Sequence, residues 1–131
     1  MKRLAVAFAT VVVLVVAPTA LAVGSLSGSY KTVIKGSTQF GGQINGTWAI
    51  KFTKGQYHVT QDGIAVVHGK DTIKGNVISL RDAKGPNACP AVGKYRFSVK
   101  GKKLTFKRLS DSKSPSCLGR GFVLAHTFTK V

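Results

Sequence analysis

The stretch NGTWAIKFTKGQYHV, residues 45–59, alternates large apolar side chains with polar ones and is divided by Lys54-Gly55. Trp48, Ile50 and Phe52 share one face of its first half, and polar side chains occupy the other face. A period of two residues is typical of a strand with one buried face, and a glycine-containing pair between two such runs indicates a hairpin. The stretch therefore predicts two antiparallel strands that bury the only tryptophan of the chain.

The same alternation continues along the chain from about residue 30. Apolar residues recur every second position rather than about every 3.6, and glycine interrupts each window long enough for a helix, so we expect no helix. Regular short strands separated by turn signals predict an all-β sandwich or barrel. The eight strand-like runs are Tyr30–Ile34, Thr47–Thr53, Gln56–Gln61, Ile64–Ile73, Val77–Arg81, Lys94–Lys100, Lys102–Leu109 and Gly121–Lys130. The fourth run contains His68-Gly69, which predicts a β-bulge there.

The lengths of the connections favour a barrel over a sandwich. The second, fourth and sixth connections are tight and centre on lysine and glycine, whereas the first, fifth and seventh are long. In an up-and-down meander, odd and even connections lie at opposite ends, so the long loops gather at one end. Only the third connection, at Asp62-Gly63, is a short one at that end. We therefore predict an eight-stranded antiparallel up-and-down barrel, whose closure removes the edge strands.

The chain contains two cysteines, Cys89 in the fifth connection and Cys117 in the seventh. Both connections lie at the same end of the predicted barrel, on neighbouring loops. We expect the two residues to form one disulfide, because the chain is also expected to be exported into an oxidising compartment.

The N-terminal residues predict that export. Lys2 and Arg3 precede an apolar run from Leu4 to Ala17, and Ala20-Leu21-Ala22 has the small-x-small form of a signal peptidase site. This pattern is typical of a secretory signal peptide over residues 1–22, with cleavage near Ala22. Residues 23–131 then form a single domain, secreted to the periplasm or the outside of the cell.

The charge is strongly positive. Twenty Lys and Arg residues face four Asp and no Glu, and removing Lys2 and Arg3 from a formal charge of +16 leaves about +14. Such a field attracts polyanions such as an anionic envelope polymer or surface. The charges are spread evenly rather than clustered with aromatic residues, so we do not expect sequence-specific nucleic-acid binding. We expect a monomer.

The inward face of the predicted barrel is bulky and apolar, and polar residues occupy the opposite positions. Its members are Trp48, Ile50, Phe52, Tyr57, Val59, Ile78, Leu80, Tyr95, Phe97, Val99, Leu104, Phe106, Phe122, Leu124 and Phe128. An eight-stranded barrel is just wide enough to be filled by side chains or to hold one small ligand. So many large residues predict a mostly filled interior with a small cavity at best.

The chain resembles the lipocalin-like, or calycin, barrels. The resemblance rests on Gly46-Thr47-Trp48, which is similar to the Gly-x-Trp motif of that family, on Arg120 near the last strand, and on the eight-strand meander. It implies a lipocalin- or avidin-like barrel in which Trp48 and Arg120 pack together at one end. With Phe52, Tyr95, Phe106 and Phe122, these two residues form either a barrel plug or the wall of a ligand site. The resemblance also implies a carrier of a small apolar or amphiphilic ligand.

Catalysis requires titratable groups close together, and the sequence offers few. The chain has no glutamate, and Asp62, Asp82 and Asp111 lie at expected turns, where aspartate commonly makes local hydrogen bonds. The three histidines, His58, His68 and His126, do not share a strand face that would hold a metal. We therefore expect that the protein is not an enzyme and that it has neither a cofactor nor a metal site.

Three functions remain open from the sequence. One is a secreted, non-enzymatic carrier of a small hydrophobic ligand. Another is a cationic extracellular module that binds anionic surfaces or polymers. The third is a secreted enzyme inhibitor that acts through the disulfide-tied loops.

Overall fold

The computed structural model describes residues 26–131 and the isolated Val12. Apart from that residue, the predicted signal peptide, residues 1–22, lies outside the described part of the chain. Among the described residues, no helix combines the length and the apolar character needed to cross a membrane.

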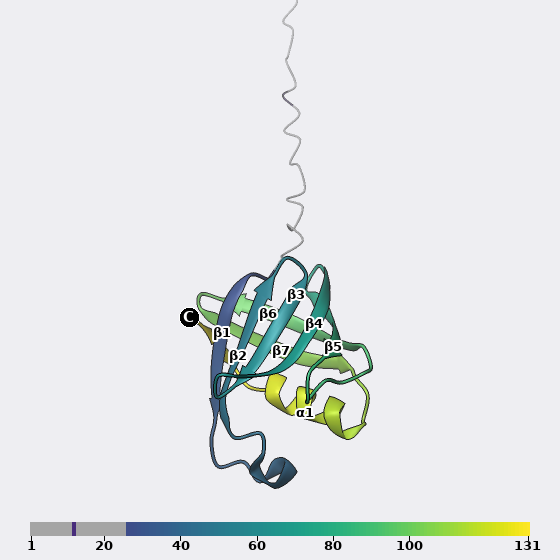
Figure 1. Cartoon of the computed structure of the whole chain (residues 1–131). Coiled ribbons are helices and arrows are strands. Elements are labelled where there is room, and N and C mark those ends of the chain that lie inside the picture. Colours follow the sequence, from purple (N-terminus) through teal and green to yellow (C-terminus); the bar gives the residue numbers. More distant parts are fainter. Residues whose placement is uncertain (1–11, 13–25) are drawn as a thin grey trace, which may run out of the picture.

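Eight antiparallel strands form a closed barrel in which each strand pairs with the next and β8 pairs with β1 (Figure 1). This confirms the predicted up-and-down architecture, and the first seven strands lie close to their predicted positions. The strands are β1 (Gly28–Ile34), β2 (Gly46–Thr53), β3 (Gln56–Gln61), β4 (Ile64–Lys74), β5 (Val77–Lys84), β6 (Gly93–Lys100), β7 (Lys103–Ser110) and β8 (Phe128–Lys130). The register shifts between His68 and Gly69, where the β-bulge is predicted.

The connections separate into two ends. The tight turns 54–55, 75–76 and 101–102 lie at one end, which we call the turn end. Segments 35–45, 62–63, 85–92 and 111–127 lie at the other, which we call the loop end. A disulfide joins Cys89, in the segment between β5 and β6, to Cys117 at the loop end, as predicted.

The structure corrects the last predicted strand. Residues Pro115–Leu124 form an α-helix, α1, so the predicted strand Gly121–Lys130 is wrong over its first part and only Phe128–Lys130 is extended. Pro115 has the fixed φ suited to a first helical turn. The two glycines of this segment lower its helix propensity, but the helix buries Val123 and Leu124 against the barrel. Packing over the loop end therefore outweighs local propensity (Figure 1).

A short 3₁₀ helix, η1 (Gln39–Gly42), lies in the first connection. Phe40 on this segment packs edge-to-face against Phe122 of α1, with ring centroids 5.6 Å apart. The first loop therefore contacts the helix at the loop end of the barrel.

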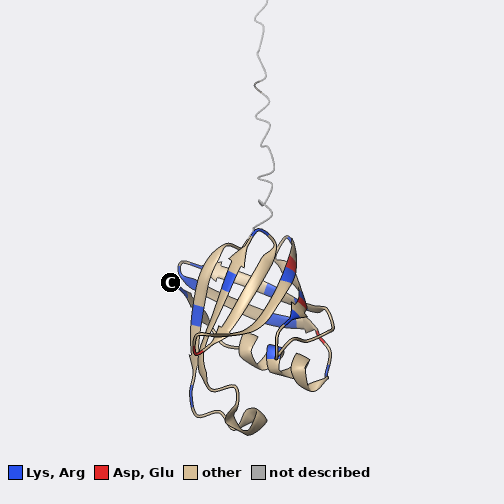
Figure 2. Ribbon diagram, in the orientation of Figure 1, with Lys and Arg blue, Asp and Glu red and all other residues tan. Residues whose placement is uncertain are grey.

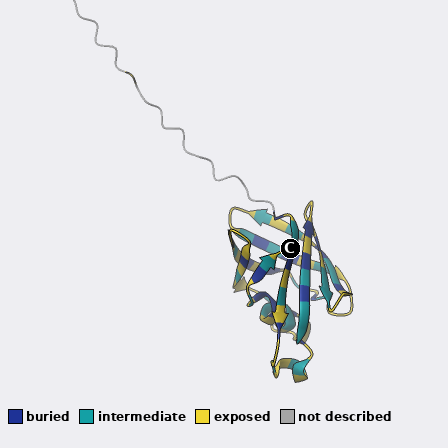
Figure 3. Ribbon diagram, turned by 90° about the vertical axis from the view of Figure 1, so that its left-hand side faces the viewer, coloured by how far each residue is buried: buried dark blue, intermediate teal, exposed yellow. Residues whose placement is uncertain are grey.

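Buried and exposed residues alternate along the strands, as the period of two predicts (Figure 3). Most of the predicted inward residues belong to the core or pack against it. Phe122 and Val99 are exceptions, at 38% and 43% exposed. The sequence predicts Phe122 on a strand, but it lies on α1, which places it outside the barrel.

Candidate functional site

The centre of the candidate site is Arg120, which α1 carries at the loop end. Its side chain is 8% exposed, and the side chains of Asp82 and Asp111 are 2% and 1% exposed. Nε of Arg120 donates to Oδ2 of Asp111 at 2.9 Å, and Nη2 donates to Oδ1 at 2.7 Å. This two-point contact is the strongest geometry available to a guanidinium and a carboxylate.

The remaining contacts connect Arg120 to the barrel wall. Nη2 also donates to the carbonyl of Ala91 at 2.8 Å, and Nη1 lies 3.4 Å from Oδ1 of Asp82. The backbone N–H of Cys89 donates to Oδ2 of Asp82 at 2.6 Å. One arginine thus connects α1 to β5 and to the segments after β5 and β7.

Two tyrosine hydroxyls complete the network. The hydroxyl of Tyr57 donates to Oδ1 of Asp82 at 2.5 Å, and the hydroxyl of Tyr95 donates to Oδ2 of Asp111. We refer to Arg120, Asp82, Asp111, Tyr57 and Tyr95 as the arginine cluster.

The pKa shifts in the cluster agree with this arrangement. Burial and the hydrogen bonds to the aspartates raise the pKa values of Tyr57 and Tyr95 far above the usual range, so both hydroxyls keep their protons. Burial acts to raise the pKa of Asp111, but hydrogen bonds from Arg120 and Tyr95 outweigh it and hold that pKa below its usual value. Burial acts to lower the pKa of Arg120, but both carboxylates outweigh it and raise that pKa.

Two glycines make room for the cluster. A Cβ at Gly69 would lie 2.4 Å from the Tyr57 ring, and a Cβ at Gly93 would lie 2.6 Å from a carboxylate oxygen of Asp111. Any larger side chain at either position would displace a member of the network.

The sequence does not predict this cluster. It predicts Asp82 and Asp111 at turns with local hydrogen bonds, whereas both carboxylates are buried against Arg120. Asp62 is exposed at the loop end, where its Oδ1 accepts a hydrogen bond from the backbone N–H of Thr47 at 2.8 Å. No local sequence pattern marks Asp82 and Asp111 as buried, because their partner Arg120 lies on another element.

Next to the arginine cluster, the barrel contains a cavity of about 270 Å³. Its walls are mainly apolar. The lining residues are Phe40, Gln43, Ile44, Trp48, Ile50, Phe52, Tyr57, Val59, Val67, Leu80, Asp82, Pro86, Asn87, Phe106, Pro115, Ser116, Gly119, Arg120, Val123 and Leu124. Gln43, Pro86, Asn87, Pro115 and Ser116 are exposed members of this lining, so the cavity opens at the loop end.

Trp48 lies on the cavity wall and is 6% exposed. Its indole N–H donates to the carbonyl of Ile44 at 2.8 Å, which holds the ring in place. Among the described residues no cation–π contact joins this ring to Arg120, whose guanidinium instead binds carboxylates.

The other residues predicted for the plug or the ligand wall separate into two groups. Phe52 and Phe106 line the cavity with Trp48 and Arg120. Tyr95 is buried at 1% exposure in the arginine cluster but does not line the cavity, and Phe122 lies outside against Phe40.

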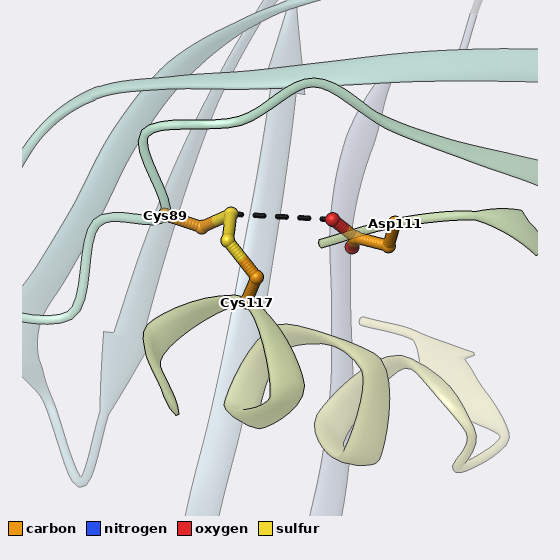
Figure 4. A group of neighbouring side chains, drawn as sticks. All are labelled: Cys89, Asp111 and Cys117. Carbon is orange, nitrogen blue, oxygen red and sulfur yellow. Dashed lines mark hydrogen bonds between the residues drawn. A yellow bond between two sulfur atoms is a disulfide. The ribbon is translucent and has the colours of Figure 1, made fainter. Parts of the chain in front are cut away.

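Cys89, Cys117 and Asp111 bring their ligand atoms within 4.8 Å of one another (Figure 4). Sγ of Cys89 lies 4.0 Å from Oδ1 of Asp111. The two sulfurs are bonded to each other, so neither offers a thiolate to a metal. The disulfide therefore acts here as a covalent link between α1 and the segment after β5.

His58 and His68 are partners across β3 and β4, with ring centroids 4.2 Å apart. Some desolvation and the nearby His58 and Lys84 lower the pKa of His68. Nδ1 of His126 donates a hydrogen bond to the carbonyl of Phe122, on α1, at 3.0 Å, and this histidine is separate from the pair.

Lysine and arginine are distributed over the outer surface, and aspartate is rare (Figure 2). The three tight turns are flanked by or contain exposed lysines, at Lys54, Lys74, Lys100, Lys102 and Lys103. The turn end therefore presents a group of positive charges at the opposite end from the cavity mouth.

Fold and site together define a small disulfide-bonded antiparallel barrel with a partly apolar internal cavity, an architecture compatible with a lipocalin-like fold. Comparisons with protein-family models, with curated proteins and with solved structures found no match to this chain.

Proposed function

We propose that this protein is a secreted, lipocalin-like binding protein, without enzymatic activity, that holds a small apolar or amphiphilic ligand inside its barrel. The observation that carries the proposal is the cavity of about 270 Å³, which is open at the loop end and lined mainly by apolar side chains. Ligand sites are usually concave and apolar with a few polar groups, and this volume lies just below the range of about 300–1,000 Å³ typical of drug-sized ligands. A compact ligand is therefore expected.

Trp48 provides the test, because it is the only tryptophan of the chain and lies on the cavity wall. Naphthalene, a compact apolar compound, is expected to change the Trp48 emission saturably. It is also expected to raise the melting temperature, since a ligand that binds only the folded state stabilises it. Fluorescence titration and thermal denaturation measure the two effects.

A matched pair of variants separates the cavity from the surface. Val67→Phe places bulk in the cavity and is expected to abolish the response, whereas Val33→Phe alters a side chain that is 53% exposed and outside the cavity. A linear, non-saturating emission change that is the same in both variants would contradict the proposal.

The turn end supports a second candidate function, the binding of an anionic polymer or surface. Its exposed lysines lie together at one end of the molecule, on or beside tight turns whose backbones the barrel holds in place. Positive charges presented by a rigid surface attract polyanions and release counterions on contact.

Retention on heparin is expected to fall steeply between about 50 and 200 mM salt. Changing Lys54, Lys74, Lys100 and Lys102 together to glutamine is expected to reduce retention more than the same change at four exposed lysines near the loop end. Those control positions are Lys35, Lys84, Lys94 and Lys113. Equal losses in the two quadruple variants would mean that only net charge matters and that the turn end is not a binding surface.

A further inference from the structure

We propose that the cavity selects ligands that carry a neutral hydrogen-bond acceptor, such as an ester or ketone carbonyl, and disfavours free carboxylates, because Nη1 of Arg120 donates to that acceptor beside two buried aspartates. This inference rests on the proposed ligand-binding function and specifies the polar group of the ligand.

The first observation is an unused donor. A guanidinium carries five N–H groups, and those on Nε and Nη2 of Arg120 bind Asp111 and Ala91. Nη1 is buried and has no hydrogen-bond partner among the described residues, with Asp82 at 3.4 Å as its nearest ion-pair contact. A buried donor without a partner is destabilising, so a ligand acceptor at this atom has a specific energetic advantage.

The second observation is the direction of that donor. Arg120, Asp82 and Tyr57 line the cavity, whereas Asp111 and Ala91 do not. Nη1 lies on the side of the guanidinium that faces Asp82, and Nη2 lies on the side of Asp111. Nη1 therefore lies beside a carboxylate that lines the cavity, whereas Nε and Nη2 are paired with groups that do not line it.

The third observation is the local charge. Two carboxylates face one guanidinium, and both accept hydrogen bonds from tyrosine hydroxyls. With both aspartates ionised the cluster carries a net charge of minus one, in spite of the strongly positive protein. A ligand carboxylate would add a third buried negative charge, which like-charge repulsion and desolvation oppose. A neutral carbonyl gains the hydrogen bond without that cost.

Methyl nonanoate and decanoate test the inference, because decanoic acid and methyl nonanoate are isomers that differ in the presence of an ionisable group. At neutral pH the ester is expected to bind the wild-type protein about tenfold or more tightly than decanoate. Solvation alone also favours an ester over a carboxylate in an apolar cavity. The decisive quantity is therefore the change, between variants, in the ratio of the dissociation constants of decanoate and methyl nonanoate.

Asp82→Asn removes one negative charge beside Nη1 and is expected to reduce the preference for the ester by about tenfold. Asp62→Asn is the matched control, since it removes the same charge from an exposed loop-end residue that does not line the cavity. It is expected to leave the ratio of the two dissociation constants unchanged.

A measurement on the wild-type protein is independent of the folding of any variant. The infrared carbonyl band of bound methyl nonanoate is expected to shift to lower frequency than in hydrocarbon solvent, as hydrogen bonding to a cation requires. An unshifted band, equal ratios in the two asparagine variants, or decanoate binding as tightly as the ester would each overturn the inference while leaving the cavity as a binding site. If neither isomer nor naphthalene binds, the proposed function fails with it.

Discussion

Arg120→Met is expected to lower the free energy of unfolding by about 3–5 kcal/mol, the usual cost of removing one partner from a buried ion pair. The methionine side chain fills much of the same space but leaves Asp82 and Asp111 buried without their cation. The carbonyl of Ala91 also loses its donor. Chemical denaturation of both proteins measures the difference.

Two further variants identify the source of that loss. Arg96→Met removes an exposed arginine from β6 and is expected to change stability by less than about 0.5 kcal/mol. Adding Asp82→Asn and Asp111→Asn to Arg120→Met is expected to recover part of the stability, because no unpaired charge then remains buried. A loss below about 1 kcal/mol for Arg120→Met would contradict a cluster that stabilises the barrel.

The cluster also predicts sensitivity to acid. The pKa of Asp111 is lower in the folded protein than its usual value, so its stabilising contribution is fully present above the pKa of the unfolded state, about 3.9. That contribution is lost as the pH falls through the lower pKa of the folded state. In the Arg120→Met variant this acid-dependent part of the unfolding free energy is expected to shrink, which pH titration of stability measures.

Changing Cys89 and Cys117 together to alanine is expected to lower the free energy of unfolding by about 3–4 kcal/mol, from the entropy of closing a loop with a sequence separation of 28 residues. For a domain of this size, the melting temperature is expected to fall by about ten degrees or more. Thermal denaturation of wild type, of the variant and of the reduced wild type measures the effect. A shift of a degree or two would show that the bridge is peripheral.

The disulfide and the arginine cluster are expected to be coupled. Both hold α1 to the segment after β5, because Cys117 and Arg120 lie on the helix and Cys89 and Ala91 lie on that segment. Once either the disulfide or the Arg120 contacts are lost, the remaining one alone holds α1 to that segment. When Arg120→Met is combined with the change of Cys89 and Cys117 to alanine, the loss of unfolding free energy is therefore expected to differ from the sum of the two separate losses. A double-mutant cycle measures this difference.

The local alternation of the chain determined the strands with good accuracy. From β1 to β7, segments in which apolar and polar residues alternate, separated by turns that often contain glycine, form strands close to the predicted ranges. The order of tight and long connections also indicated the closed meander and placed Cys89 and Cys117 within reach of each other. The strand positions depend on residues that are neighbours in sequence, and the topology depends on the order and length of the connections. Both can be read directly from the sequence.

Only the tertiary structure decided the helix and the cluster. In residues 115–124, two glycines and scattered apolar residues resemble a loop and the start of a strand, and the segment becomes helical because it covers the loop end of the barrel. That helix brings Arg120 to Asp82 and Asp111, which lie 38 and 9 residues away in sequence.

No local pattern marks those aspartates as buried, because the burial of a charge depends on a partner that another element supplies. The same reason applies to the cavity beside Trp48. The alternation of the strand placed that ring inside the barrel. The space left next to it depends on how the side chains of several strands and of α1 pack together, which is a property of the folded barrel alone.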